Sequence, residues 1–141
     1  MKDWERRFAE AGLRITAPRR AVMQVLVEAQ ASLSPQEICE QGRCLHRSLG
    51  LVTVYRTLEL LSEMDLVRRV HREGGCHGYL PISPGHRHTL ICRRCGQGVD
   101  FAGGDDLQAM IVAVETRTGY RVDGHLLQLS GLCPQCQQLP G

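Results

Sequence analysis

Seven cysteines carry the most informative chemistry of this 141-residue chain. Four of them form two C-x-x-C pairs, Cys92 with Cys95 and Cys133 with Cys136. Two residues between cysteines let both sulfurs of a pair face one ion at about 2.3 Å, and two such pairs complete a tetrahedral thiolate shell. The spacing therefore predicts a zinc ion held by all four cysteines. A thiol redox or disulfide pair is the poorer interpretation, because redox motifs rarely come doubled around a strand and a helix.

The predicted zinc ion has a structural role rather than a catalytic one. Four thiolates leave no open coordination position for a substrate, so the ion holds a small domain together. Neither cysteine pair is preceded by the H-x-E motif of zinc deaminases. The sequence also places no nucleophile beside a base, so we expect neither an enzyme nor a small-molecule substrate.

Residues 1–82 are predicted to form a helical unit that ends in a two-stranded ribbon. Apolar residues recur at helical spacing, and Ser34-Pro35-Gln36-Glu37 is a capping box that opens one of the helices. After Asp65 the apolar period shifts toward two, which predicts strands at Leu66–Val70 and Tyr79–Leu80. Three or four helices followed by a hairpin is the winged-helix arrangement.

The second half is predicted to be a smaller α/β unit behind a hinge. Pro81, Pro84 and Gly85 mark the hinge, which we place at residues 83–86. Residues 87–141 then read as two strands, His88–Cys92 and Gly98–Phe101, a helix, Asp106–Thr118, and a third strand, Arg121–Leu129. The predicted fold class is α+β, with a winged-helix domain joined to a small domain that contains the four cysteines.

Composition limits the partners and the compartment. The 17 Lys and Arg residues nearly balance the 15 Asp and Glu residues, but a balanced total can hide a basic face and does not exclude nucleic-acid binding. No run approaches the roughly 18 apolar residues of a membrane span, and the first residues lead into no apolar signal core. We expect a cytoplasmic protein without a membrane partner.

The chain resembles the Fur family of metal-dependent transcriptional regulators between Leu13 and Cys136, with the zinc uptake regulators as the most similar branch. The resemblance is carried by Arg14–Arg20, Thr53–Leu58, His86–Gly96, Gly119-Tyr120, His125 and Gly131–Cys136. It implies a homodimeric repressor whose C-terminal domains pair. It also implies that the winged helices bind an inverted-repeat operator in double-stranded DNA when a regulatory metal is bound.

Two groups of side chains are candidates for the DNA contacts. Hydroxyl, phenol and guanidinium groups near the start of the fourth predicted helix can contact base edges or phosphates; they belong to Thr53, Tyr55, Arg56 and Thr57. A cationic cluster beside the second helix suits phosphates or a narrow minor groove; it consists of Arg14, Arg19 and Arg20. The alternative is that Tyr55 is half in the core and the arginines are solvated.

A second ion is expected at the hinge, where it would favour one closed geometry. The predicted regulatory ligands are His71, Cys76, His86, His88 and Asp100. Asp100 matches a position where relatives carry an acidic ligand. Arg68 stands where zinc-sensing relatives place one, so His71 is expected to substitute for it. His77 should point away from Cys76 on a regular strand, and we expect only Cys76 of this pair to bind.

His86 and His88 have an alternative role. Counted back from Cys92, they match the pair that relatives use for a third site, together with His125 and an acid on the following helix. Asp105 or Asp106 could be that acid. The hinge is the favoured location for the two histidines.

The predicted regulatory metal is zinc. A soft thiolate beside imidazoles suits zinc better than iron or manganese. Ser32 also stands where iron- or peroxide-sensing relatives often carry a histidine. The sequence thus favours a zinc sensor that controls zinc-uptake genes. The alternatives are an iron- or peroxide-responsive regulator, or a redox switch in which oxidation of Cys92 or Cys133 ejects the structural zinc.

Overall fold

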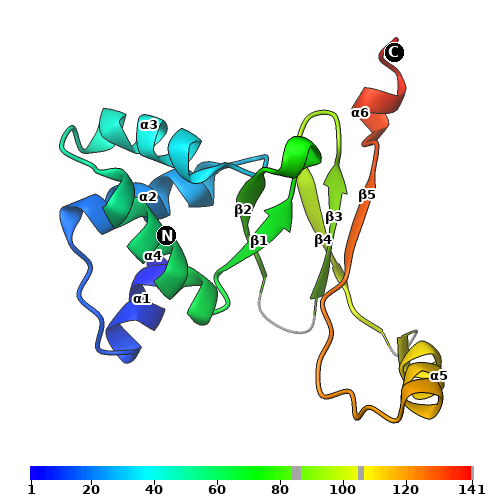
Figure 1. Ribbon diagram of the computed structural model, residues 1–141. Helices are drawn as coiled ribbons and strands as arrows, with labels where there is room; N and C mark the ends of the chain where they lie inside the picture. Colours follow the sequence, from blue (N-terminus) through cyan, green and yellow to red (C-terminus); the bar gives the residue numbers. More distant parts are fainter. Residues whose placement is uncertain (84–86, 105–106, 141) are drawn as a thin grey trace.

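The computed structural model describes residues 1–83, 87–104 and 107–140, and contains four N-terminal helices followed by two small sheets (Figure 1). The helices are α1 (Lys2–Glu10), α2 (Ala17–Glu28), α3 (Pro35–Leu45) and α4 (Leu51–Glu63). The predicted capping box is confirmed: the Glu37 N–H donates to Ser34 Oγ (3.2 Å), and the Ser34 N–H donates to Glu37 Oε2 (2.6 Å). It fixes the start of α3.

The four helices enclose an apolar core of their own. Val54, Leu58 and Leu61 recur along α4 at helical spacing and are all buried. They pack against buried side chains of the other three helices, among them Phe8, Val22, Leu26 and Ile38. Burial of this apolar surface is what stabilises the helical unit.

The ribbon after α4 consists of β1 (Val67–His71) and β2 (His77–Pro81), joined by the short helical turn Glu73–Gly75. The strands are antiparallel, and Arg68 pairs with Leu80 while His71 pairs with His77. Alternation along β1 puts Arg68 and Val70 on one face and Arg69 and His71 on the other. The predicted ribbon is confirmed, and with four helices before it the N-terminal part is a winged helix.

The second sheet has the strand order β4-β3-β5. Its central strand β3 (Arg87–Cys92) is antiparallel to β4 (Gly98–Ala102) and parallel to β5 (Gln128–Gly131). The helix α5 (Gln108–Thr118) leads from β4 toward β5, and α6 (Pro134–Gln137) follows β5. This mixed helix and sheet arrangement confirms the predicted fold class.

The predicted strand Arg121–Leu129 is wrong over most of its length. Residues 119–127 have no regular structure, and β5 begins only at Gln128. The register explains most of the difference: Gln128 pairs with Thr89, two residues after β3 begins, so residues 121–125 run past the end of their partner strand. Apolar alternation cannot make a strand without a neighbouring strand to bond.

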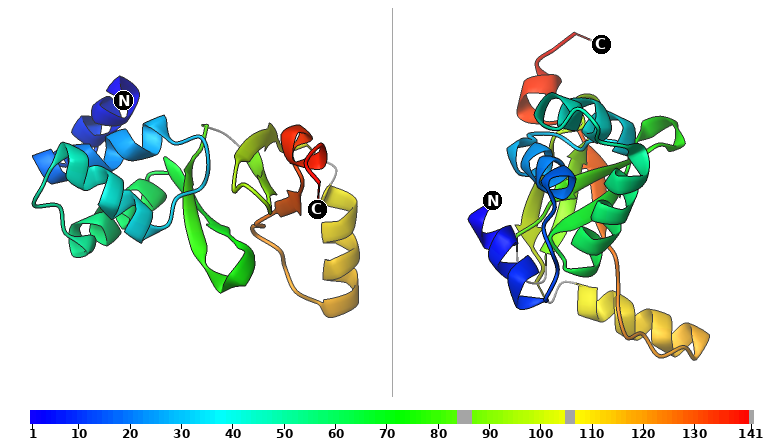
Figure 2. Two further views of the ribbon diagram at one scale, coloured as in Figure 1. Left: turned by 90° about the horizontal axis from the view of Figure 1, so that it is seen from above. Right: turned by 90° about the vertical axis from the view of Figure 1, so that its left-hand side faces the viewer.

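The ribbon lies between the helices and the second sheet (Figure 2). Val70, Leu80 and Ile91 form a small apolar cluster where the two sheets meet. Beside it the Gln128 side chain bonds the His71 backbone twice, accepting from its N–H (3.0 Å) and donating to its carbonyl (3.1 Å). The boundary at residues 83–86 stays a prediction, and residues 84–86 lie outside the described part of the chain.

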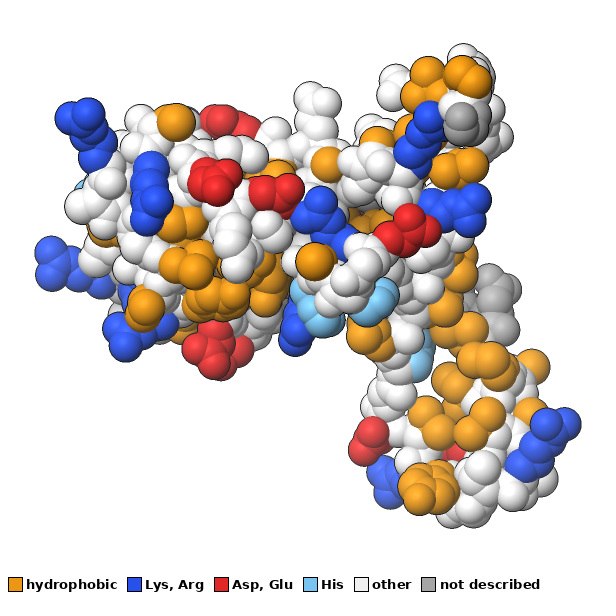
Figure 3. All heavy atoms as spheres, turned by 45° about the horizontal axis from the view of Figure 1, so that its top comes forward, with side chains coloured by type: hydrophobic (Ala, Val, Ile, Leu, Met, Phe, Trp, Pro, Cys, Tyr) orange, Lys and Arg blue, Asp and Glu red, His pale blue; other side chains and the backbone are white. Residues whose placement is uncertain are grey.

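Apolar side chains are exposed on the C-terminal part of the molecule. The helix α5 extends away from the rest of the chain and contains no buried residue. Figure 3 shows hydrophobic side chains gathered over it; Met110, Val112 and Val114 are all exposed. Among the described residues, no helix is long and apolar enough to cross a membrane.

Candidate metal centres and nucleic-acid interface

The four cysteines of the two C-x-x-C pairs lie together, as predicted. Cys92 ends β3 and Cys95 lies in the turn after it, while Cys133 precedes α6 and Cys136 lies within it. Pairing of Cys92 with Gly131 brings the two segments side by side. All four sulfurs lie within 4.8 Å of one another, and those of Cys95 and Cys133 are 3.8 Å apart. Four sulfurs around zinc would be about 3.8 Å apart, so the cluster fits zinc.

Backbone groups and crowding set the charges of these thiols. Hydrogen bonds from the backbone N–H groups of Cys133 and Cys95 lower the pKa of Cys92 to about 6. The hydrogen bond with the Cys133 sulfur, together with burial, raises the pKa of Cys136 to about 12. The Cys92 thiol therefore loses its proton more readily than the Cys136 thiol. A metal ion that binds here must release the remaining protons.

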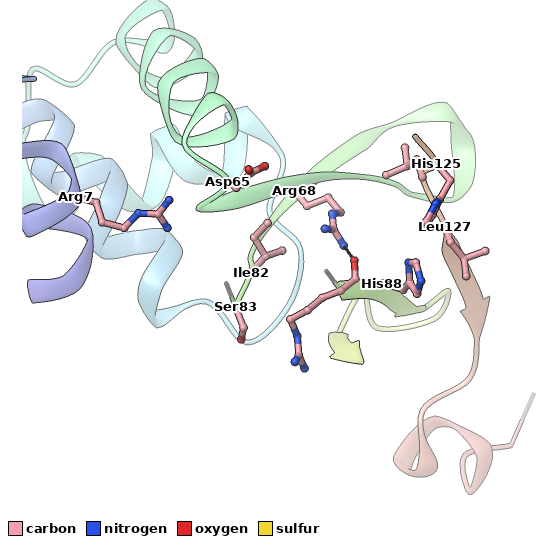
Figure 4. Close-up of a pocket in the computed structure, with 10 residues that line it drawn as sticks. Arg7, Asp65, Arg68, Ile82, Ser83, His88, His125 and Leu127 are labelled. Carbon is pink, nitrogen blue, oxygen red and sulfur yellow. Dashed lines mark hydrogen bonds between the residues drawn. The ribbon is translucent and has the colours of Figure 1, made fainter. Parts of the chain in front are cut away.

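His88 and His125 face each other in a pocket between the helical unit and the second sheet (Figure 4). Their ring centroids are 5.3 Å apart, and the His88 ring also packs 5.5 Å from Phe101. The pocket has a volume of about 360 Å³, and Arg7 and Asp65 line it from the helical side. His88 is thus beside His125, as in the alternative third site. The other members expected there, His86, Asp105 and Asp106, lie outside the described residues.

Among the described residues, the members of the predicted hinge site do not come together, and its use of Asp100 with His88 is wrong for a geometric reason. Asp100 pairs with Thr89 across the β3–β4 ladder, so its side chain lies on the opposite face from that of His88. Asp100 instead accepts hydrogen bonds from the Ser83 N–H (2.9 Å) and the Thr89 hydroxyl (3.4 Å). Within the described ranges, the four cysteines are the one cluster of three or more ligand side chains.

His71 lies on the opposite face of β1 from Arg68, and Cys76 follows the turn at the end of the ribbon. His71 and His77 are cross-strand neighbours with ring centroids 5.4 Å apart, on the face of the ribbon that Arg69 shares. Cys76 is exposed and lines a groove with His77 and Tyr55, beside α3 and α4. Burial and the positive charge of Arg69 lower the pKa of His77. The expectation that Cys76 and His77 face opposite ways assumed a regular strand through both residues, whereas β2 begins at His77 and Cys76 precedes it.

The helix α4 presents Tyr55 and Arg56 to solvent at its N-terminal half. Thr53 is half-buried, and Tyr55 is 48% exposed. The DNA contact predicted for Thr57 is wrong: Thr57 is 0% exposed, and its hydroxyl donates to the Thr53 carbonyl (2.7 Å). Thr57 shares the buried face of α4 with Val54 and Leu61, three residues before it and four after it.

Sequence reasoning missed two arginines of the ribbon. Arg69 and Arg72 line the same groove as Tyr55, so a basic strand edge lies beside the exposed face of α4. Arg72 forms an ion pair with Glu37 (2.8 Å), which ties the ribbon to α3. The available signal was the run of basic residues within the predicted hairpin.

The other predicted arginine cluster is partly engaged within the protein. Arg19 donates to the Arg14 carbonyl (2.8 Å), and Arg20 forms an ion pair with Glu5 of α1. Arg14 and Arg20 are nevertheless exposed. The three side chains lie around the start of α2 and keep a positive surface there.

The sequence profile described as the ferric uptake regulator family matches residues 10–130 of this chain. The ferric uptake regulation protein of Legionella pneumophila is 34% identical over 130 residues, which cover 91% of this chain and 94% of the relative. The zinc uptake regulation protein of Mycobacterium tuberculosis (strain ATCC 25618 / H37Rv) is 32% identical over 130 residues, which cover 92% and 99% of the two chains.

Solved structures agree in fold. A zinc uptake regulator complexed with zinc and DNA superimposes with a TM-score of 0.78 at 21% identity, over 97% of this chain and 92% of the other. The ferric uptake regulator of Helicobacter pylori superimposes with a TM-score of 0.66, also at 21% identity, over 99% and 93%. These likenesses extend over both sheets and the helical unit.

Proposed function

The chain belongs to the ferric uptake regulator family, and on this premise we propose that it is a zinc-responsive repressor that binds an inverted-repeat operator as a homodimer. The family is one of metal-responsive, DNA-binding transcriptional regulators rather than enzymes. The proposal adds the metal, the ligands and the form of the DNA site.

The pair of His88 and His125 is the observation that carries the proposed metal response. Both imidazoles face a pocket whose other wall belongs to the helical unit, through Arg7 and Asp65. We assign the regulatory ion to these two histidines, with His86 and either Asp105 or Asp106 as further ligands. A divalent ion bound there supplies positive charge and fixed coordination geometry. The histidines would then hold the loop before β5 against β3. Metal binding would thereby favour one arrangement of the junction between the ribbon and the second sheet.

Zinc is favoured over iron on two grounds. Ser32 is buried at the position where a histidine was expected for an iron or peroxide sensor. The M. tuberculosis relative is a zinc uptake regulation protein, and the neighbour with DNA is a zinc uptake regulator. Cys76 does not support the choice of zinc, because it lines the groove beside Tyr55 and is not among the residues that line the pocket of His88 and His125.

Iron is the second candidate. Imidazole ligands suit iron as well as zinc, and the L. pneumophila relative is a ferric uptake regulation protein. The four-cysteine cluster does not distinguish the two sensors, because in either case we assign it a structural zinc ion.

The proposed DNA surface is the groove between α4 and the ribbon. Tyr55 and Arg56 supply the groups for base edges, while Arg69 and Arg72 supply charge for phosphates. Thr53, Arg14, Arg19 and Arg20 complete the proposed contacts. Two such surfaces related by a two-fold axis match an inverted repeat, and the exposed apolar side chains around α5 are the proposed dimer contact.

The test measures DNA affinity across buffered free metal. The probe is a duplex selected from random sequence by the full-length protein, in parallel pools with Zn²⁺ and with anaerobic Fe²⁺, against a scrambled duplex. We expect steep tightening with Zn²⁺ that is lost in His125→Ala. Tightening with Fe²⁺ alone would establish the iron sensor, and a flat response to both metals would overturn metal sensing.

The same assay tests the DNA surface. Arg56→Ala should weaken binding to the selected duplex by about 1–3 kcal/mol and relax its preference over the scrambled one, as for a lost base contact. Arg69→Ala should weaken both duplexes about equally and lower the salt slope. Equal losses on both duplexes for Arg56→Ala would remove this residue from base recognition.

A further inference from the structure

We propose that Arg68 supplies a built-in positive charge where the hinge metal ion was predicted, so that the Asp100 side of the junction takes no metal. Arg68 thereby positions the ribbon against the second sheet without a cofactor. This inference rests on the proposed function, since it determines which of two candidate sites senses the metal. The residues present around Asp100 therefore do not fit the metal ion that was expected at the hinge.

Arg68 reaches from β1 across the junction to β3. Its Nη1 atom donates to the Arg87 carbonyl (2.9 Å) and to the Thr89 hydroxyl (2.9 Å). Arg87 is the first residue after the predicted hinge, and Thr89 is completely buried. One guanidinium therefore connects the ribbon with the beginning of the second sheet, and Figure 4 shows Arg68 at this place.

Asp100 continues this network to the other end of the hinge. The Thr89 hydroxyl donates to Asp100 Oδ1 (3.4 Å), and the Ser83 N–H donates to Asp100 Oδ2 (2.9 Å). Arg87 Nε lies 3.9 Å from the same Oδ2, and Arg87 Nη2 donates to the Asp100 carbonyl (3.1 Å). Ser83 is the first residue of the predicted hinge and Arg87 is the residue after it, so Asp100 is bonded to the chain at both ends of the hinge.

A divalent ion does not fit beside Asp100. The two guanidinium groups carry positive charge and have no lone pair to donate to a metal. Both carboxylate oxygens already accept hydrogen bonds, and the side chain is only 14% exposed. His71 lies on the opposite face of β1 from Arg68, and His88 lies on the opposite face of β3 from Asp100. Of the described side chains around Asp100, Thr89 would be the one remaining ligand, through its hydroxyl oxygen.

The junction thus contains one network that needs no metal ion and one histidine pair that is proposed to bind a metal ion. The Arg68, Thr89 and Asp100 network sets the ribbon on one face of β3 whether or not metal is present. The His88 side chain lies on the other face of β3, beside His125, in a pocket that Arg68 and Arg87 also line, and metal loading would act there. Arg68 is a positioning residue, because its hydrogen bonds are to atoms of β3. It does not line the groove beside Tyr55, which is the proposed DNA surface.

The first experiment counts metal ions on the full-length protein and needs no DNA. Wild type, Asp100→Asn and Thr89→Val are saturated with Zn²⁺, and the ions per chain and the affinity of the last ion are measured by competition with a chelating indicator. We expect both variants to retain the wild-type count, with affinities within about twofold. Loss of one ion per chain, or tenfold weaker binding, in both variants would overturn the proposal.

The second experiment measures DNA binding of zinc-saturated Arg68→Ala to the selected duplex. We expect affinity to fall about tenfold, within the range usual for coupling between sites, with the metal count and the salt slope unchanged. Arg68→Lys should recover part of the loss, because an ammonium group can still donate hydrogen bonds. The matched control is Arg121→Ala, which removes the same charge from an exposed position and should bind like wild type.

The outcomes separate this inference from the proposed function. Wild-type affinity in Arg68→Ala overturns the positioning role, and a salt slope reduced by about one would assign Arg68 to a phosphate instead. If the DNA affinity of wild type does not depend on metal, the proposed function fails. The metal counts of Asp100→Asn and Thr89→Val still decide whether Asp100 binds an ion.

Discussion

The helical N-terminal unit and the C-terminal sheet region bury their apolar side chains very differently. Leu26, Leu58 and Leu61 are 0–1% exposed within the helical unit, whereas Val114 and Leu129 of the C-terminal region are 43% and 46% exposed. The helical unit therefore closes a core from its own residues. The C-terminal region is too small to do so.

The two regions therefore depend on different interactions in order to stay folded. Burial of apolar surface stabilises the helices directly. In the C-terminal region the four cysteines join β3 to α6, and small domains of this kind commonly depend on a structural metal ion or on a partner chain. We expect the two regions to respond separately to metal removal, to core mutations and to changes on α5.

Metal removal is the change with the largest expected effect. Stripping zinc with a strong chelator, or substituting Cys136→Ser, should unfold β3, β5 and α6 while the helical unit stays folded. Structural zinc contributes about 10–16 kcal/mol in zinc-finger peptides, more than a sheet of this size can replace. Hydrogen exchange, resolved by segment, measures the loss of protection in β3, β5 and α6. The control is Cys44→Ser on α3. Equal loss of protection in α2 and α4 would contradict the independence of the two regions.

A core mutation in the helical unit tests the opposite case. Leu58→Ala should lower the free energy of unfolding of that unit by about 2–5 kcal/mol, because it leaves a cavity at a side chain that is 1% exposed. The single tryptophan, Trp4, lies in the same core and reports the transition in urea. Leu139→Ala, at an exposed position near the C-terminus, is the control and should leave the Trp4 transition in place.

Sequence patterns predicted the helical unit well because its signals are local. The Ser34 capping box and the spacing of Val54, Leu58 and Leu61 each specify an element without reference to distant residues. The same spacing already placed Thr57 on the buried face, so its assignment to DNA contact overlooked a signal that was present. The two C-x-x-C pairs were equally informative, since metal geometry fixes how they must meet.

The junction could not be predicted in the same way, because it depends on strand register. Alternation does show that Arg68 and His71, three residues apart, face opposite ways on β1. It does not show which face meets the second sheet, and that decides whether an arginine or a histidine approaches Asp100. The start of β5 likewise followed from pairing with Thr89 rather than from its own sequence.

The exposed face of α5 provides the next test. Met110 and Val114 lie one turn apart and share a face. Val114→Asp should weaken self-association at least about tenfold, or about 1.4 kcal/mol, because the interface would bury an unpaired charge. Sedimentation velocity measures the dimer, and the urea transition of Trp4 should not move. Arg117→Ala, on the same helix, is the control. An unchanged dimer would leave α5 outside the proposed interface.

The smallest expected effect concerns the ion pair that ties the ribbon to α3. Burial raises the pKa of Glu37, but hydrogen bonds from Arg72 and from the Ser34 N–H and hydroxyl outweigh it and lower the pKa below 4.5. Because the folded pKa is depressed, the stabilisation is present above pH 4.5 and is lost as pH falls through the folded pKa. Glu37→Gln should therefore cost less than about 1 kcal/mol at pH 7, as for other exposed pairs, and the cost should vanish in acid.

The urea transition of Trp4 measures this cost between pH 7 and pH 3, with Glu40→Gln at an exposed position of the same helix as the control. Only the difference between the two variants is interpreted, because acid also protonates other carboxylates. The cost should be the same with and without zinc, since Glu37, Ser34 and Arg72 all belong to the helical unit and its ribbon. If chelation abolishes it, the position of the ribbon depends on the C-terminal region, and the two regions do not fold independently.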